Sequence, residues 1–140
     1  MSPERQILAS TLLAAYAFRA IPGTAAINRH GHKTRIGEDG HIGAGFLPDL
    51  DDPLTRAGLA VLAREALNEP TAHARPVHQD RLSDCEPEIR WHVERPVEGE
   101  HEWLRYSGAW GAGDHRDPPI NEATEIEAYA AAILAAPAKP

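Results

Sequence analysis

The sequence predicts a small single domain of the α+β class, with about three helices packed on a short antiparallel sheet. Three observations support this prediction. Three segments carry apolar residues at helical spacing after helix-start signals, residues 89–94 alternate apolar and polar side chains, and the chain has 140 residues. That length suits one domain with an ordinary core, which we place at residues 1–136, followed by a loose tail at residues 137–140.

The first predicted element is a helix over residues 3–20. Ser2 can serve as its N-cap, and Pro3 takes the first helical position. Three leucines and a tyrosine cluster on one side of this helix, while Ile7 and Phe18 fall on another. A helix that is apolar on two sides is largely buried, so we expect core packing rather than a partner-binding face.

Residues 24–46 are predicted to form short strands joined by turns. The candidate strands are Ala25–Arg29, Lys33–Ile36 and His41–Gly43. One turn is expected at His30-Gly31 and the next at residues 37–40, where glycine and polar residues favour tight turns. The glycines of this segment also make it flexible.

The second helix is predicted to begin after Asp52 and to end at about Asn68. Asp52 is a suitable N-cap, Pro53 takes the first helical position, and asparagine is a residue type that ends helices. Residues 69–87 contain three prolines and show no clear period. We therefore expect a connecting loop there, with one helical turn around Gln79–Asp84.

Residues 88–107 are predicted to form a β-hairpin. Three apolar residues, with Trp91 at their centre, alternate with polar neighbours, as in a strand with one buried face. The turn is expected within residues 96–99, and the return strand over residues 101–107 would place Trp103 opposite the Trp91 region. We expect Trp91 in the core and Trp103 on the other face of the sheet.

A Gly/Pro loop containing Trp110 is predicted to connect the hairpin to the last helix. This helix should start near Asn121 and end before Pro137. Its buried side follows the helical period closely, with Ile126, Tyr129, Ala130, Ile133 and Leu134.

The charge distribution argues against nucleic-acid binding. The net charge is −7, with nine acids and eight bases in residues 1–80 but twelve acids and six bases in residues 81–140. Nucleic-acid binders need a positive patch to displace counterions from phosphate, and the sequence shows none. An acidic half favours solubility and partners with a basic surface, while a solvated acidic face is the simpler alternative.

The sequence predicts a cytoplasmic protein, or one delivered inside a phage particle. Cys85 is the only cysteine, so no internal disulfide can form, and its acidic neighbours disfavour a reactive thiolate. No apolar run approaches the roughly 18 to 20 residues that a membrane span needs. The N-terminus also lacks the charged and apolar regions of a signal peptide. We therefore expect no membrane partner.

Aromatic and acidic residues between positions 98 and 114 are the candidate binding residues. Aromatic side chains are enriched at the energetic centres of protein interfaces, and carboxylates suit a basic partner surface. The candidates are Glu100, Glu102, Trp103, Tyr106, Trp110 and Asp114. Trp110 is the strongest of them, because a tryptophan between glycines in a loop is an unusual core residue.

A cluster of histidines is the only candidate for a cofactor, a metal ion. His30, His32 and His41 lie close to two carboxylates in the sequence, and transition metals accept both ligand types. The H-x-H pattern followed by Glu38 is similar to the metal motif of cupins. The Glu stands one residue too far along the chain, and the second cupin motif is absent. A polar surface hairpin is the alternative interpretation.

The preferred functional hypothesis is a small, acidic, non-catalytic protein-binding module of bacterial or phage origin. The origin is indicated by twelve Arg against two Lys and by frequent Ala. An inhibitor, immunity or anti-defence protein fits the size, the acidity and the lack of a catalytic signature. The enzyme alternative is a small metal-dependent enzyme that uses the histidine and carboxylate cluster.

A second alternative comes from the first helix. The segment RQILASTLLAAYAFRAIPG, residues 5–23, resembles the first helix of some small phage tail-completion proteins. This resemblance covers under twenty residues of the chain. It implies a phage virion subunit, of the head–tail or tail-completion type, that would assemble into a homo-oligomeric ring.

Overall fold

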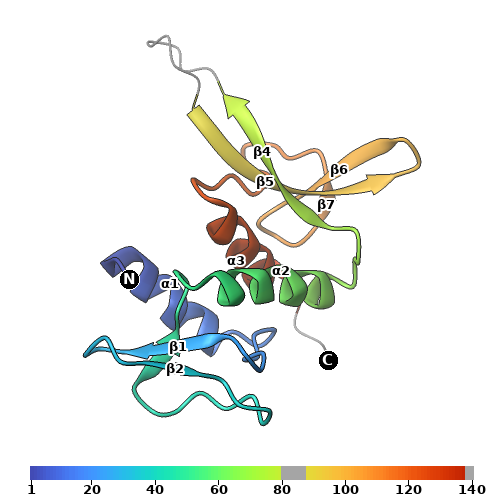
Figure 1. Ribbon diagram of the computed structural model, residues 1–140. Helices are drawn as coiled ribbons and strands as arrows, with labels where there is room; N and C mark the ends of the chain where they lie inside the picture. Colours follow the sequence, from blue (N-terminus) through green and yellow to red (C-terminus); the bar gives the residue numbers. More distant parts are fainter. Residues whose placement is uncertain (80–87, 138–140) are drawn as a thin grey trace. The chain divides into compact units, whose positions relative to one another are not determined.

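The computed structural model describes residues 1–79 and 88–137 of the chain and confirms the α+β class. The described residues form three helices and two antiparallel sheets, of three and four strands, where the sequence pattern predicted one sheet (Figure 1). The chain divides into two compact units, residues 1–62 and 63–140. Of the predicted loose tail, only Pro137 lies within the described residues.

The first unit begins with helix α1, Pro3–Ala14, which is shorter than predicted. The Ser2 side chain accepts a hydrogen bond from the backbone N–H of Arg5, as expected of an N-cap. The helix packs on strand β3 and buries Ala9 on that side. Ile7 is 69% exposed, so the prediction that this helix is largely buried on both of its apolar sides was wrong.

The sheet of the first unit has the strand order β2-β1-β3. Its strands are β1 Ala25–Asn28, β2 Lys33–Arg35 and β3 Phe46–Pro48. The prediction of a strand at His41–Gly43 was wrong, because the third strand lies at the apolar residues that follow the glycines. Leu47 pairs with Ile27 in this strand, while Gly40 and Gly45 adopt the positive φ values that suit turns.

Helix α2, Pro53–Leu67, has the predicted ends. Asp52 Oδ2 accepts hydrogen bonds from the backbone N–H groups of Leu54 and Thr55, which are left without partners at a helix start. At the other end Asn68 has a φ of 52° and donates its N–H to the carbonyl oxygen of Glu65. This is the left-handed cap for which asparagine is suited.

The second unit contains a four-stranded sheet of order β4-β5-β6-β7. Its strands are β4 His73–Gln79, β5 Glu88–Val97, β6 Glu100–Leu104 and β7 Trp110–Gly111. The loop predicted over residues 69–87 was wrong where β4 forms, and residues 80–87, with Cys85, lie outside the described residues. The predicted Gly/Pro loop around Trp110 was likewise wrong at β7, which pairs with β6.

Proline is tolerated in β4 because of where its nitrogen points. Pro76 pairs with Trp91, whose N–H and carbonyl both bond to Glu122 on the other side of β5. The pair is therefore not hydrogen-bonded across β4 and β5, and the Pro76 nitrogen faces the open edge of the sheet. Edge positions of this kind are where prolines occur in strands.

The hairpin between β5 and β6 closes with a two-residue turn inside the predicted range. Glu98 and Gly99 have φ values of 42° and 85°, as in a type I′ turn. This turn pairs Trp103 with Glu94, three residues after Trp91 in the strand that was predicted to lie opposite it. Trp91 lies instead between β4 and the segment before the last helix.

Helix α3, Glu125–Ala135, starts four residues later than predicted because Thr124 provides the N-cap. Its side chain accepts a hydrogen bond from the N–H of Glu127. The helix packs on β4 and β5, and the Tyr129 hydroxyl accepts a hydrogen bond from the N–H of Ala74. None of the described helices is long and apolar enough to cross a membrane.

Candidate functional site

The two faces of the four-stranded sheet differ in chemistry. Cross-strand pairing aligns His73, Glu94 and Trp103 on one face, because side chains opposite each other in a sheet share a side. On the other face Val93 and Leu104 are almost fully buried. We call the polar side the His92 face; it consists of His73, Arg75, His92, Glu94, His101 and Trp103.

A buried carboxylate organises one half of the His92 face. The Glu94 side chain is 4% exposed, and its Oε1 lies 2.9 Å from His73 Nε2. Arg75 donates from a terminal guanidinium nitrogen to Oε2 at 3.1 Å, and His101 Nδ1 lies 3.6 Å from Oε1. A buried charge requires such partners. Glu94 therefore holds three basic side chains of β4 and β6 in place.

His92 organises the other half and is only 3% exposed. Its Nδ1 lies 2.6 Å from the carbonyl oxygen of Ile120, so Nδ1 carries the proton and donates. Burial lowers the pKa of His92, and the hydrogen bond to Ile120 opposes that shift. The neutral ring stacks on Trp103 with centroids 4.8 Å apart and an interplanar angle of 15°.

A depression of about 280 Å³ lies on the His92 face. Its polar wall comes from three charged or polar groups, Arg75, His92 and Glu94, and its apolar wall includes the indole of Trp103, which is 38% exposed. The complete lining is Arg75, Pro76, Val77, His78, His92, Glu94 and Trp103. The volume is below the range of about 300–1,000 Å³ that is typical of small-molecule sites and suits a single side chain.

The β5–β6 hairpin projects beyond the strands on both sides of it. β4 pairs with β5 only as far as Glu94, and β7 pairs with β6 only from Trp103 onward. Residues 95–102 therefore form a two-stranded ribbon that pairs with no other strand of the described residues, drawn in gold in Figure 1. At the base of this ribbon Arg95 bonds to Glu69 Oε2 at 2.9 Å. We call residues 95–102 the hairpin finger. Glu98 and Glu100 lie exposed at its end.

The predicted binding residues fall into two groups, of which the first lies on the finger and beside it. Glu100 is on the finger, and Trp103 belongs to the His92 face. Two further predicted binding residues, Glu102 and Trp110, contact Arg95. The Arg95 guanidinium bonds to Glu102 Oε1 at 3.0 Å, and its central carbon lies 4.5 Å from the centroid of the Trp110 ring. Trp110 is thus covered by Arg95 and is not a free loop residue.

The second group, Tyr106 and Asp114, stabilises the connection to α3. The Tyr106 hydroxyl lies 2.8 Å from Glu122 Oε1 and accepts the N–H of Asn121, and burial raises its pKa. Asp114 Oδ1 accepts hydrogen bonds from the backbone N–H groups of Arg116 and Asp117. These hydrogen bonds, that from Arg116 most strongly, lower the pKa of the Asp114 carboxyl group. Both side chains therefore form hydrogen bonds to residues of the segment that leads to α3.

The predicted histidine set is placed on the surface of the first unit. His30, His32 and His41 are exposed, and the rings of His30 and His32 lie 6.4 Å apart. Across residues 1–79 and 88–137, no group of three or more His, Cys, Asp or Glu is arranged to hold a metal ion. The metal-site hypothesis therefore stays a prediction.

Sequence reasoning missed the residues that form the His92 face around Trp103. The alternation that placed Trp91 and Val93 inside also placed His92 and Glu94 on the opposite, solvent side. Their burial depends on side chains of β4, which the three prolines of residues 69–87 had marked as a loop. A signal was present in the period-2 pattern of His73, Arg75 and Val77, which matches a strand.

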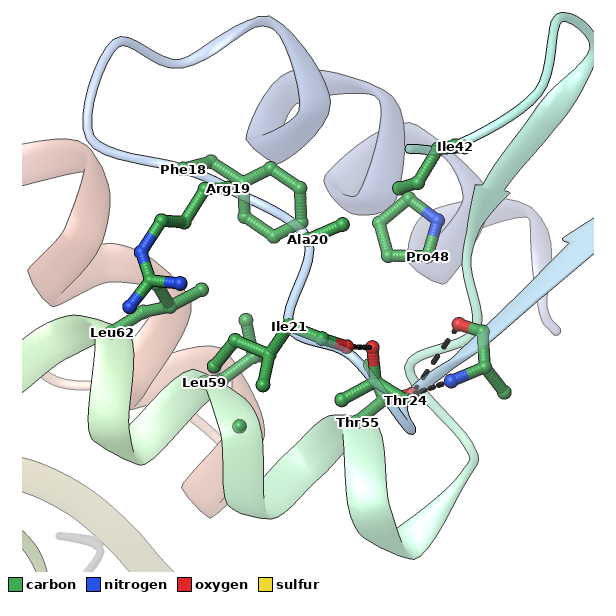
Figure 2. A pocket seen from close by; sticks show the side chains of 12 residues that line it. Phe18, Arg19, Ala20, Ile21, Thr24, Ile42, Pro48, Thr55, Leu59 and Leu62 are labelled. Carbon is green, nitrogen blue, oxygen red and sulfur yellow. Dashed lines mark hydrogen bonds between the residues drawn. The ribbon is translucent and has the colours of Figure 1, made fainter. Parts of the chain in front are cut away.

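The first unit contains a small apolar cavity, shown in Figure 2. Its volume is about 10 Å³, which is about the space of one water molecule. The two threonines beside it are occupied, since Thr24 Oγ1 donates to the Ile21 carbonyl and Thr55 Oγ1 accepts the N–H of Ala25. This cavity is a packing gap of the core rather than a binding site.

The His92 face and the hairpin finger are therefore the two candidate functional features of the described residues. Both belong to the second unit; they share His101, and the finger begins directly after Glu94 and ends directly before Trp103. No family model, no curated protein and no solved structure matches the chain.

Proposed function

We propose that the protein is a small non-catalytic protein-binding module that docks onto its partner with the hairpin finger and the adjoining His92 face. The observation that carries this proposal is the projection of residues 95–102 beyond both neighbouring strands. An isolated two-stranded ribbon is only marginally stable in water, so the part of the finger beyond the Arg95 and Glu102 contacts adds little to the fold. An extended finger can enter a groove on another protein.

The charge of the second unit indicates the chemistry of the partner. Residues 63–140 contain fifteen acids and eight bases, whereas residues 1–62 contain six of each. The entire net charge of −7 thus lies in the unit that carries the finger. Complementary charge speeds association and selects partners, so we expect a basic surface around the groove. Inhibitor, immunity and anti-defence proteins of bacteria or phages are the class that this proposal favours.

The test compares the wild-type protein with a finger variant and a charge-matched control. The finger variant carries Glu98→Lys and Glu100→Lys. The control carries Glu4→Lys and Glu38→Lys, which change two exposed residues of the first unit by the same charge. Partners captured from bacterial and phage-infected extracts by the wild-type protein are purified, and the dissociation constant of each is measured with all three proteins.

For a specific partner we expect the finger variant to raise the dissociation constant at least about tenfold and the control to raise it less than about twofold. A loss of affinity that is equal in both variants would mean that net charge alone attracts the partner. Unchanged binding by the finger variant would remove the finger from the interface and with it this proposal.

A further inference from the structure

The depression on the His92 face presents a defined set of hydrogen-bonding groups. The two nitrogens of an imidazole point in nearly opposite directions, so His92 Nε2 is directed away from Ile120 and toward β4, where the depression lies. His92 as a residue is only 3% exposed, and among the described residues its Nε2 has no hydrogen-bond partner. Nε2 is not one of the fully buried unpaired side-chain atoms, so it is open to solvent. Arg75 lines the same depression and uses only one terminal nitrogen to bond Glu94.

These groups select a neutral ligand that can both donate and accept. A carboxylate or phosphate would face the lone pair of His92 Nε2 and the carboxylate of Glu94. A cationic group would face the guanidinium of Arg75, which is 55% exposed. A hydroxyl group satisfies both sides, because it can donate its hydrogen to Nε2 and accept an N–H of Arg75.

The remaining side chains on this face of the depression are apolar. Val77 of β4 shares the His92 face because it pairs with Arg90, and the half-exposed indole of Trp103 lies on the same face in β6. Aromatic rings pack well against such surfaces in offset or edge-to-face contact. The volume of about 280 Å³ has room for one aromatic side chain.

We propose that this depression is a pocket for one phenol-bearing side chain, a tyrosine of the docked partner, with its hydroxyl between His92 Nε2 and Arg75 and its ring against Trp103. This assignment rests on the proposed protein-binding function. The pocket would add an aromatic contact to an interface that the acidic finger otherwise forms through charge. Tyrosine is enriched at the centres of interfaces because it combines a large apolar ring with one polar group.

The test uses N-acetyl-tyrosinamide as the probe and N-acetyl-phenylalaninamide as its match without the hydroxyl. The readout is the NMR signal of the Trp103 indole N–H during titration of the whole protein to millimolar probe concentrations. We expect saturable shifts, with the tyrosine probe binding at least about fivefold more tightly, a factor that corresponds to one net hydrogen bond. Equal binding of both probes, or no shift with either, would overturn the proposal.

Variants then locate the probe on the protein. Arg75→Gln should abolish the preference for the tyrosine probe, while Arg116→Gln, at an exposed arginine outside the pocket lining, should leave it unchanged. Val77→Phe fills the depression and should prevent binding of both probes; probe binding that survives this change places the site elsewhere. Tighter binding of N-acetyl-glutaminamide would overturn the phenol class in favour of a carboxamide.

The outcome is separable from that of the proposed function. Failure of the probes, together with a loss of partner affinity in the Glu98→Lys and Glu100→Lys variant, would remove the pocket and leave finger docking in place. Probe binding in a protein whose finger variant keeps full partner affinity would support the pocket and contradict the finger.

Discussion

A buried histidine makes the stability of the second unit depend on pH. Burial lowers the pKa of His92, and the positive charge of Arg90 acts in the same direction, whereas Ile120 and Glu94 oppose the shift. In the unfolded chain a histidine takes up a proton near pH 6.5. Below that pH the unfolded state therefore binds more protons than the native state, and the free energy of unfolding falls as the pH falls.

Replacing His92 by asparagine should reduce this acid dependence. The asparagine amide can still donate to the Ile120 carbonyl, but it does not titrate. We expect the free energy of unfolding to fall less between pH 7 and pH 5 than in the wild-type protein. Urea unfolding followed by tryptophan fluorescence measures it, because all three tryptophans lie in the second unit.

The matched control for this measurement is His115→Asn, at an exposed histidine of the same unit. In this control the free energy of unfolding should fall with decreasing pH as steeply as in the wild-type protein. Parallel curves for His92→Asn and the wild type would show that burial of His92 does not govern the acid response.

Residues that act through their sequence neighbours could be predicted, and residues that act across the sheet could not. Ser2 and Asp52 cap helices as expected, because a cap bonds to N–H groups two or three residues away. The burial of His92 and Glu94 depends on side chains from β4 and β6, which pattern alone does not place. Trp103 was predicted as a binding residue, but its stacking on His92 required the register.

At the scale of elements, the turn after β6 is held against the end of α3. Gly108 has a φ of 91°, and a Cβ placed on it would lie 2.5 Å from the carbonyl oxygen of Ala135. Contacts below 3.0 Å are essentially never seen for a Cβ. The chain therefore needs glycine here for two reasons, its backbone conformation and the close approach of the helix end.

Gly108→Ala should destabilise the second unit by about 2–4 kcal/mol, combining a left-handed backbone with a clash. Gly99→Ala is the matched control, because Gly99 has a similar φ of 85° but nothing within 4 Å of the added Cβ. In Gly99→Ala the free energy of unfolding should fall by only about 1–2 kcal/mol. Urea midpoints of the two variants give the difference, and equal losses would mean that the contact with Ala135 adds nothing.

Elements with strong local signals were predicted better than those defined by their partners. Helix α2 has the expected ends because both of its caps are local. β4 was missed because Pro76 argues against a strand, and only the pairing of Trp91 with Glu122 makes the position acceptable. β3 and β7 are two or three residues long, too short for a period to be recognised, and exist because β1 and β6 pair with them.

At the scale of the whole molecule, the proposed function predicts a small assembly. A module that binds a partner in a groove should be a monomer or dimer on its own, whereas a virion ring would contain many copies. We expect native mass spectrometry to show masses near 15.2 kDa or twice that value. A closed ring of higher order would contradict the binding proposal and support the virion alternative.

The single proline of β4 has a consequence for the protein in concentrated solution. The free edge of a sheet can recruit strands from other molecules, and the resulting stacks grow into fibres. At the middle of that edge the Pro76 nitrogen carries no hydrogen, so an incoming strand meets a gap in the row of donors. Pro76, whose presence in the sequence argued against a strand, therefore disfavours self-association at the open edge.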